Sequence, residues 1–175
     1  TASCRLDALQ EQFRLSEADA VLSWSSPGTA AGVFEVLWPL FHGARTVLSP
    51  GSNQTGPGWL RRFISERQVS VVFANPPALS RFLETGGEDT VSAPSSPGRR
   101  PGEAPASDSA DFLRCVLCSG EPLRRDLAES FREHFPGRLF SLYGTPEAGA
   151  VVLTAVVDDL LSQPGEQTQF LPAGY

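Results

Sequence analysis

The sequence contains no lysine: all 14 of its basic Lys-or-Arg side chains are arginines. Lysine is required for Schiff-base catalysis, for the lysine of a phosphate-binding loop and for acid–base catalysis by an ammonium group. We therefore expect no catalytic lysine function within this chain. Methionine is also absent and the sequence begins with Thr1, so we expect an internal piece of a longer chain or a processed product.

Cysteine, positive charge and long apolar runs are also scarce. Three cysteines, an odd number, fit a reducing compartment better than a disulfide framework, and we expect a cytoplasmic location. The longest apolar run, residues 148–157, is interrupted by Thr154 and is shorter than the roughly 20 residues that span a bilayer, so no membrane contact is expected. A net charge of −6 argues against a nucleic-acid partner.

Residues 86–110 differ sharply in composition from the rest of the chain. They contain four glycines, four prolines and five serines, and Val91 is their one large apolar residue. Such a segment buries too little surface to offset its ordering entropy. We therefore expect a disordered surface loop inserted in a single partial domain that covers residues 1–175.

On both sides of this loop, short β-branched or apolar runs alternate with helical stretches. Strands are expected at residues 20–24, 45–48, 70–74, 113–118, 138–142 and 150–157, and helices at residues 5–13, 29–42, 59–67, 123–135 and from Pro76 onward. Successive strand–helix units of this kind form parallel sheets. The sequence predicts an α/β fold with a largely parallel sheet flanked by helices.

Cys115 and Cys118 form a C-x-x-C pattern, which in other contexts marks a zinc or redox site. Three residues of separation along a strand place the two side chains on opposite faces, where they cannot share a metal ion or form a disulfide. The remaining candidate ligands have no suitable spacing. We interpret both as buried strand cysteines.

The expected helix at residues 29–42 is apolar on both faces except for Glu35. Ala30, Phe34 and Leu37 share one face because residues separated by four and seven positions are neighbours on a helix. Two alanines, Ala30 and Ala31, before a large aromatic either leave a hollow bounded by Phe34 or allow close packing of a buried helix. Glu35 would in either case be a structural salt-bridge or cap partner.

Two turns carry polar groups directly after neighbouring strands. These are SGEP at residues 119–122 and YGTPE at residues 143–147. In a parallel sheet both would lie at the carboxyl edge, where such folds bind ligands. Tyr143 is suited to stacking on a base and Glu147 to binding Mg²⁺. The alternative is two tight turns with solvated acids.

The order of these motifs resembles the adenylate-forming superfamily, which includes the adenylation domains of nonribosomal peptide synthetases, β-alanine-activating enzymes and acyl-CoA synthetases. The resemblance rests on GVFEVLWPL at residues 32–40 with GA at 43–44, NPP at 75–77, SGEPL at 119–123, LYGTPE at 142–147 and LPAGY at 171–175. It covers nearly the whole chain, and the peptide-synthetase branch is the most similar. It implies that the chain is part of the large N-terminal lobe of an adenylate-forming domain.

The resemblance also implies a two-step reaction. A carboxylic acid and Mg·ATP form an acyl adenylate with loss of pyrophosphate, and the acyl group then passes to coenzyme A or to the phosphopantetheine of a carrier protein. By position, the nucleotide would contact Ser119, Gly120, Glu121, Ser141, Tyr143, Gly144 and Thr145; Glu147 would hold Mg²⁺; and Ala30, Ala31 and Phe34 would line the acyl pocket. Because two anions must meet, the cation and a closed pocket would supply much of the catalysis.

Several positions depart from the family's pattern. Ala30 stands where amino-acid-activating members usually have an aspartate for the α-amino group, so an ordinary α-amino acid substrate is not expected. Pro146 replaces the hydroxyl residue before the glutamate, and Ser141 replaces a frequent asparagine. The lysine-containing phosphate loop and the carboxy-terminal lobe are absent, so the isolated chain would be inactive without these flanking parts. The alternative is a degenerate, inactive domain kept for binding or scaffolding.

Overall fold

The computed structural model describes residues 2–50, 59–83, 112–145, 153–162 and 169–172. Its strands are β1 (Ala20–Ser23), β2 (Arg45–Leu48), β3 (Val71–Ala74), β4 (Cys115–Cys118), β5 (Arg138–Tyr143) and β6 (Leu153–Val156). Its helices are α1 (Ala2–Phe13), α2 (Ala30–Phe41), α3 (Trp59–Arg67), α4 (Pro76–Leu83), α5 (Arg125–His134) and α6 (Val157–Ser162). The loop predicted at residues 86–110 lies outside the described residues.

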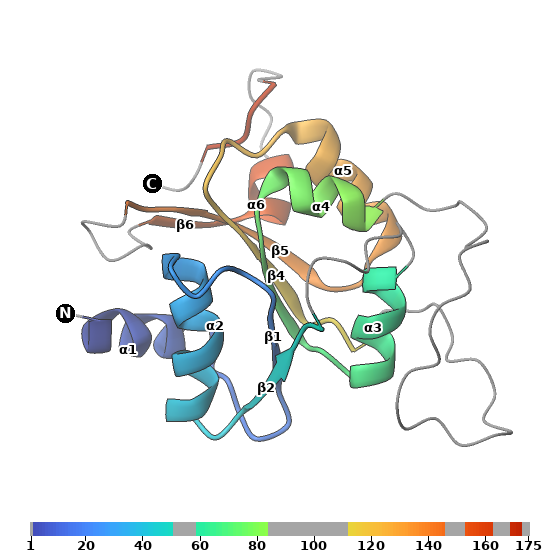
Figure 1. Ribbon diagram of the computed structural model, residues 1–175. Coiled ribbons are helices and arrows are strands. Elements are labelled where there is room, and N and C mark those ends of the chain that lie inside the picture. The colour runs from blue at the N-terminus through green and yellow to red at the C-terminus, as the bar shows by residue number, and fades with distance from the viewer. Residues whose placement is uncertain (1, 51–58, 84–111, 146–152, 163–168, 173–175) are drawn as a thin grey trace, which may run out of the picture.

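The strands form one sheet in the order β2-β1-β3-β4-β5-β6 (Figure 1). The pairs from β2 to β5 are parallel, and β6 runs antiparallel to β5, with Tyr143 opposite Leu153. A parallel crossover needs about a dozen or more residues, and the short connection between Tyr143 and Leu153 allows a direct antiparallel return instead. The largely parallel α/β sheet predicted from the sequence is confirmed.

Helices cover both faces of the sheet (Figure 1). On one face, α1 and α2 pack on alternate strand residues such as Val71, Phe73 and Leu117. On the other face, α3, α4, α5 and α6 pack on the intervening residues, among them Val72 and Val116. This alternation follows from the two-residue period of a strand. The described part of the chain is therefore a three-layer structure with a core on each side of the sheet.

Two predicted boundaries were wrong in informative ways. The apolar run at 150–157 does not continue as one strand, because Val157 begins helix α6. Helix α5 begins at Arg125 and not at Leu123: Leu123 is buried, and Arg124 forms an isolated antiparallel bridge with Phe170. The second difference arises from a long-range pairing that a local pattern does not contain.

The two strand cysteines lie on opposite faces of the sheet, as predicted. Cys115 belongs to the core under α1 and α2, whereas Cys118 belongs to the core under α3–α6. Both are free thiols. Burial raises the pKa of each thiol to about 12. Neither Cys115 nor Cys118 can therefore act as a nucleophile at neutral pH, because the thiolate is the reactive form.

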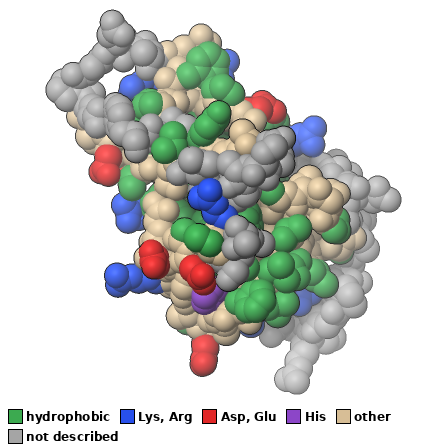
Figure 2. All heavy atoms as spheres, turned by 90° about the vertical axis from the view of Figure 1, so that its left-hand side faces the viewer, with side chains coloured by type: hydrophobic (Ala, Val, Ile, Leu, Met, Phe, Trp, Pro, Cys, Tyr) green, Lys and Arg blue, Asp and Glu red, His purple; other side chains and the backbone are tan. Residues whose placement is uncertain are grey.

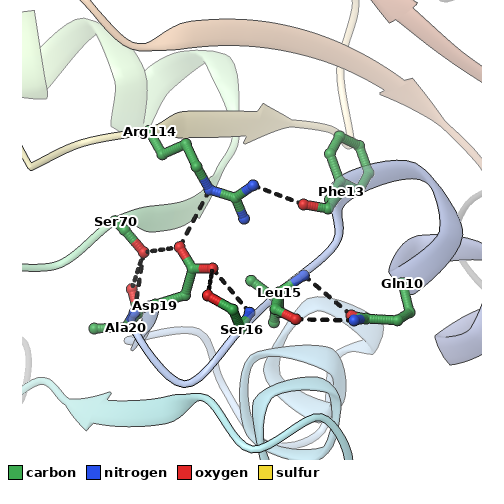
Figure 3. A network of polar contacts seen from close by, with 8 residues as sticks. All are labelled: Gln10, Phe13, Leu15, Ser16, Asp19, Ala20, Ser70 and Arg114. Carbon is green, nitrogen blue, oxygen red and sulfur yellow. Dashed lines mark hydrogen bonds and ion pairs between the residues drawn. The ribbon is translucent and has the colours of Figure 1, made fainter.

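A polar network joins the amino ends of β1, β3 and β4 (Figure 3). Asp19, which is 7% exposed, accepts hydrogen bonds from the Ser70 hydroxyl at 2.8 Å and the Ser16 amide at 2.9 Å. The Arg114 Nε atom lies 3.1 Å from the Asp19 carboxylate, and its Nη1 donates to the carbonyl of Phe13. The network fixes the loop after α1 to the edge of the sheet opposite the predicted site.

One face of the described structure carries exposed apolar side chains. Leu40 and Phe41 of α2 are 63% and 70% exposed, and Leu48 of the edge strand β2 is 71% exposed. Figure 2, which views the molecule from the side of α1 and α2, shows hydrophobic side chains gathering there. Patches of this kind commonly mark contact surfaces.

Among the described residues, no helix is both long enough and apolar enough to cross a bilayer.

Candidate functional site at the carboxyl edge of the sheet

The turns that carry the predicted site meet at one edge of the sheet, near the top of Figure 1. Parallel register aligns Ala74 of β3 with Cys118 of β4, and Cys118 with Ser141 of β5. Neighbouring strands are about 4.8 Å apart, so the segments that follow them are neighbours as well. The structure therefore brings together residues 119–122 and 143–145, as the sequence predicted. The start of α2 lies at the same edge because α2 follows the parallel strand β1.

The turn after β4 has a geometry that requires glycine. The Ser119 amide donates to the carbonyl of Ala74 at 2.9 Å, which extends the sheet by one residue. Gly120 then adopts a φ of +96°, a conformation that residues with a side chain rarely adopt. Ser119 is half-buried, whereas Gly120 and Glu121 are exposed at the edge. The turn thus presents backbone and one carboxylate to solvent.

The turn after β5 contains both an exposed and a buried member of the predicted set. Tyr143 is 53% exposed at the end of the strand, and its ring is available for stacking. Gly144 and Thr145 are half-buried. Ser141 is only 5% exposed, because it lies inside the sheet between Cys118 and Ala155. The structure therefore places Tyr143 at the surface of the edge and Ser141 beneath it.

The first turns of α2 hold the three predicted acyl-pocket residues. Thr29 caps the helix by accepting a hydrogen bond from the Gly32 amide at 3.1 Å. Ala30 and Ala31 are half-buried, and Phe34 is 5% exposed within the core under α1 and α2. Phe34 is therefore closely packed in the core, as expected if the small residues of α2 serve the close packing of a buried helix.

Glu35, on the same helix, is fully buried and holds the turn after β1. One carboxylate oxygen accepts the amides of Trp24 at 3.0 Å and Ser25 at 2.9 Å, and the other accepts the Ser25 hydroxyl at 2.5 Å. Burial raises the pKa of Glu35, although the hydrogen bonds from Ser25 and Trp24 oppose the shift. Glu35 is therefore structural, as expected, but its partners are two amides and a hydroxyl of the preceding turn and not a salt bridge or a helix cap.

A groove of about 550 Å³ adjoins Glu121 at this edge. It is lined by Pro76, Pro77, Ser80, Glu121, Pro122, Arg124, Asp126, Leu127 and Phe170. Phe170 reaches it because residues 169–171 pair with residues 123–125 through the Arg125 and Leu171 amides. No local sequence signal predicts this pairing, so sequence reasoning alone does not find the contribution of Phe170. A smaller cavity of about 200 Å³ lies between α5 and α6, and neither of the two is lined by Ala30, Ala31 or Phe34.

Beside the groove, the Arg124 guanidinium pairs with the Asp126 carboxylate at the start of α5. The hydrogen bond from Arg124 lowers the pKa of Asp126. Both side chains are exposed, so the pair is screened by solvent and sets local charge more than stability.

The predicted metal ligand Glu147 lies outside the described residues, as does Pro146. Within the described ranges, no group of three His, Cys, Asp or Glu side chains is arranged to hold a metal ion. A Mg²⁺ ion that travels with ATP is bound mainly by phosphate oxygens and water and needs only one or two carboxylates. The described turns at this edge supply one such carboxylate, that of Glu121, so the residues present fit a Mg²⁺ ion bound to ATP.

Comparisons with known proteins identify chains of similar sequence and similar fold. The chain is 29% identical to the vanchrobactin synthetase VabF of Vibrio anguillarum over 148 residues, which cover 85% of the chain and 5% of VabF. The adenylation domain AlmE of Vibrio cholerae, in complex with glycyl-adenosine-5'-phosphate, has the same fold with a TM-score of 0.73 at 20% identity. That match covers 98% of this chain and 28% of AlmE.

The O-succinylbenzoate coenzyme A synthetase MenE of Bacillus subtilis, in complex with ATP and magnesium ion, gives a TM-score of 0.70 at 18% identity. It is matched over 97% of this chain and 31% of its own length. The 175 residues thus span a small part of each relative. The model of the AMP-binding enzyme family matches residues 1–174, and the chain belongs to that family.

Proposed function

We propose that this chain forms the central part of an AMP-forming ligase domain that activates a carboxylic acid with Mg·ATP. The observation that carries the proposal is the meeting of the start of α2 with the turns at residues 119–122 and 143–145, which belong to two motifs of the family, on one edge of the sheet. Open α/β sheets bind ligands at this edge. The groove beside Glu121 has the volume of a small-molecule site.

Each turn has a distinct role in this proposal. The exposed ring of Tyr143 stacks on adenine, and Gly120 allows the backbone to approach the nucleoside closely. Ser119, Glu121, Gly144 and Thr145 line the same side, with Ser141 supporting them from within the sheet. Glu147 would hold the Mg²⁺ ion, which when bound would supply neutralisation of phosphate charge. Ala30 and Ala31, which are half-buried, form the wall for the acid, and Phe34 packs in the core behind them.

The acid that binds this wall has no ammonium group beside α2. Ala30 offers no charge, and both oxygens of Glu35 are already occupied by Trp24 and Ser25. An ammonium group placed there would find no free carboxylate on α2, and desolvation without such a partner is costly. The proposal therefore favours aryl, β-amino or other acids over ordinary α-amino acids.

The acyl group then passes to the thiol of coenzyme A or of a carrier protein's phosphopantetheine. Cys115 and Cys118 do not take part, because their buried thiols have a pKa of about 12. The lysines for both half-reactions would come from the flanking parts of the parent chain, since this chain contains none.

The test is acid-dependent exchange of pyrophosphate into ATP by the parent polypeptide, with a panel of amino acids and their deamino analogues. Base stacking on an aromatic ring contributes roughly 1–3 kcal/mol, so Tyr143→Ala should raise the KM for ATP by about tenfold. Phe112, which is 50% exposed and lies near the amino end of β4, provides the matched control. Phe112→Ala should leave the KM for ATP unchanged.

A second candidate is an inactive binding or scaffolding module. The close packing of Phe34, which is 5% exposed and lines neither the groove beside Glu121 nor the cavity between α5 and α6, favours this second function. If the parent shows no exchange with any acid yet still binds ATP, this second function replaces the first.

A further inference from the structure

Glu35 is the only charged residue of α2, and it is 0% exposed. A buried carboxylate is costly unless it is well hydrogen-bonded. Asp19, the other buried carboxylate described, lies beside Arg114. Glu35 instead receives its hydrogen bonds from two backbone amides and one hydroxyl of a turn. The burial of Glu35 is therefore accounted for by the hydrogen bonds that it accepts from that turn.

The turn in question, residues 24–29, joins β1 to α2 at the carboxyl edge. Glu35 holds its first two residues by accepting from Trp24 and Ser25. Its last residue, Thr29, caps α2 and donates its hydroxyl to the carbonyl of Ser26 at 2.7 Å. Both ends of the turn are therefore attached to the same helix.

Two further contacts fix this unit relative to the sheet. Gly32 lies so close to the turn that an added Cβ would be 2.2 Å from the Ser26 carbonyl oxygen. The indole Nε1 of Trp24 donates to the carbonyl of Phe73 on β3 at 2.7 Å. These contacts hold the helix, the turn and β3 together, and Glu35 joins the helix to the first residues of the turn as Thr29 does to its last.

We propose that Glu35 is a positioning residue for the acid-binding wall: by holding residues 24–25 against α2, it sets where Ala30 and Ala31 stand at the carboxyl edge. This inference rests on the proposed function for the identity of the ligand. Glu35 touches no substrate, because its side chain is wholly buried. Its effect reaches the acid through the geometry of the turn and the first turn of α2.

Removal of this carboxylate should affect the turn more than the sheet. The amides of Trp24 and Ser25 would lose their acceptor, whereas β1 keeps its ladder to β2 and β3. A displacement of about 1 Å in a group that positions a substrate can cost about 100-fold in rate. Glu35→Ala should therefore weaken acid binding selectively.

The experiment uses the parent polypeptide with three variants. Glu35→Ala removes both acceptor oxygens. Glu35→Gln keeps one oxygen, which can accept the two amides, and its NH₂ group can donate to the Ser25 hydroxyl. Asp19→Ala is the matched control, because it breaks a comparable buried network at the opposite edge of the sheet (Figure 3).

In pyrophosphate exchange, Glu35→Ala should raise the KM for the acid by about tenfold or more and leave the KM for ATP unchanged. Glu35→Gln should restore most of the loss, and Asp19→Ala should lower stability without changing either KM. Hydrogen–deuterium exchange of residues 24–31 should accelerate in Glu35→Ala, while residues 71–74 and 115–118 keep the wild-type rate.

Equal changes in the KM for the acid in Glu35→Ala and Asp19→Ala would overturn the proposal, since the effect would then be one of general stability. Unchanged deuterium exchange at residues 24–31 would overturn it as well, whatever the kinetics. If the wild-type parent shows no pyrophosphate exchange with any acid, the proposed function fails. The deuterium exchange of the same variants then decides on its own whether Glu35 holds the turn.

Discussion

Substitution of Gly32 by alanine is the sharpest test of how the candidate site is built. An added Cβ would lie 2.2 Å from the carbonyl oxygen of Ser26, 2.8 Å from its carbonyl carbon and 3.2 Å from the Cα of Pro27. All three atoms belong to the backbone, so no change of side-chain rotamer relieves the contact. Ordinary contact begins at 3.4 Å, so the turn and α2 would have to separate by about 1.2 Å.

The expected cost follows from opposing terms. Alanine is favoured over glycine within a helix by about 1 kcal/mol. Overpacking of this kind costs about 1–3 kcal/mol, and separation of α2 from the turn also weakens the hydrogen bonds between Glu35 and the amides of Trp24 and Ser25, at about 1 kcal/mol each. The clash prevails over the helix propensity. We expect Gly32→Ala to lower the free energy of unfolding by roughly 2–4 kcal/mol.

Urea unfolding followed by circular dichroism measures this difference, and an unchanged slope would show that the compactness of both states is preserved. Gly28→Ala is the matched control, because an added Cβ there meets only the Ser26 hydroxyl at 3.9 Å. It should change the free energy of unfolding by less than about 0.5 kcal/mol. If Gly32→Ala were as stable as the wild type, the close approach of α2 to this turn would be refuted.

Three further predictions concern buried groups. At pH 8, iodoacetamide should modify the exposed Cys4 and spare Cys115 and Cys118, because a pKa of about 12 leaves these two buried thiols almost no thiolate. Mass spectrometry of the folded protein measures the modification, and alkylation of all three cysteines before unfolding would contradict this prediction. Asp19→Ala should cost about 2–3 kcal/mol in urea unfolding, since several buried donors lose their acceptor, and a neutral effect would contradict the network. Burial raises the pKa of Glu35 in the folded state above its value in the unfolded chain. The contribution of Glu35 to stability is therefore fully present below its unfolded-state pKa and is lost as the pH rises through its folded-state pKa. Glu35→Gln should lack this component, so the stability difference between wild type and variant should change with pH in that window, and a constant difference would be evidence against a raised pKa.

Much of the fold could be predicted because its signals are local. The β-branched runs at β2 and β3 and the apolar spacing at α3 occupy a few consecutive residues, and each predicts its element within a residue or so. The opposite orientation of Cys115 and Cys118 followed from the period of a strand alone. The placement of two turns at one edge then required only that the strands be parallel.

What the sequence did not contain is the set of contacts between distant segments. The bridge of Arg124 with Phe170 shortens α5 and brings an aromatic ring to the groove beside Glu121. Glu35 accepts hydrogen bonds from Trp24 and Ser25, which lie 11 and 10 residues earlier in the chain. Nothing in the local sequence pattern selects those partners over a salt bridge. Both features depend on how elements pack, which is decided by the whole core and not by neighbours in sequence.

The two edges of the sheet differ in how their buried carboxylates are held. At the amino edge, Asp19 is neutralised by Arg114, so the loop there is held by a charge pair and a hydroxyl network. At the carboxyl edge, Glu35 is held by two amides and one hydroxyl, and none of these hydrogen bonds comes from a cationic group. Under the proposed function, the charge of the acid would therefore be stabilised on the Mg·ATP side and not by a charged group of α2.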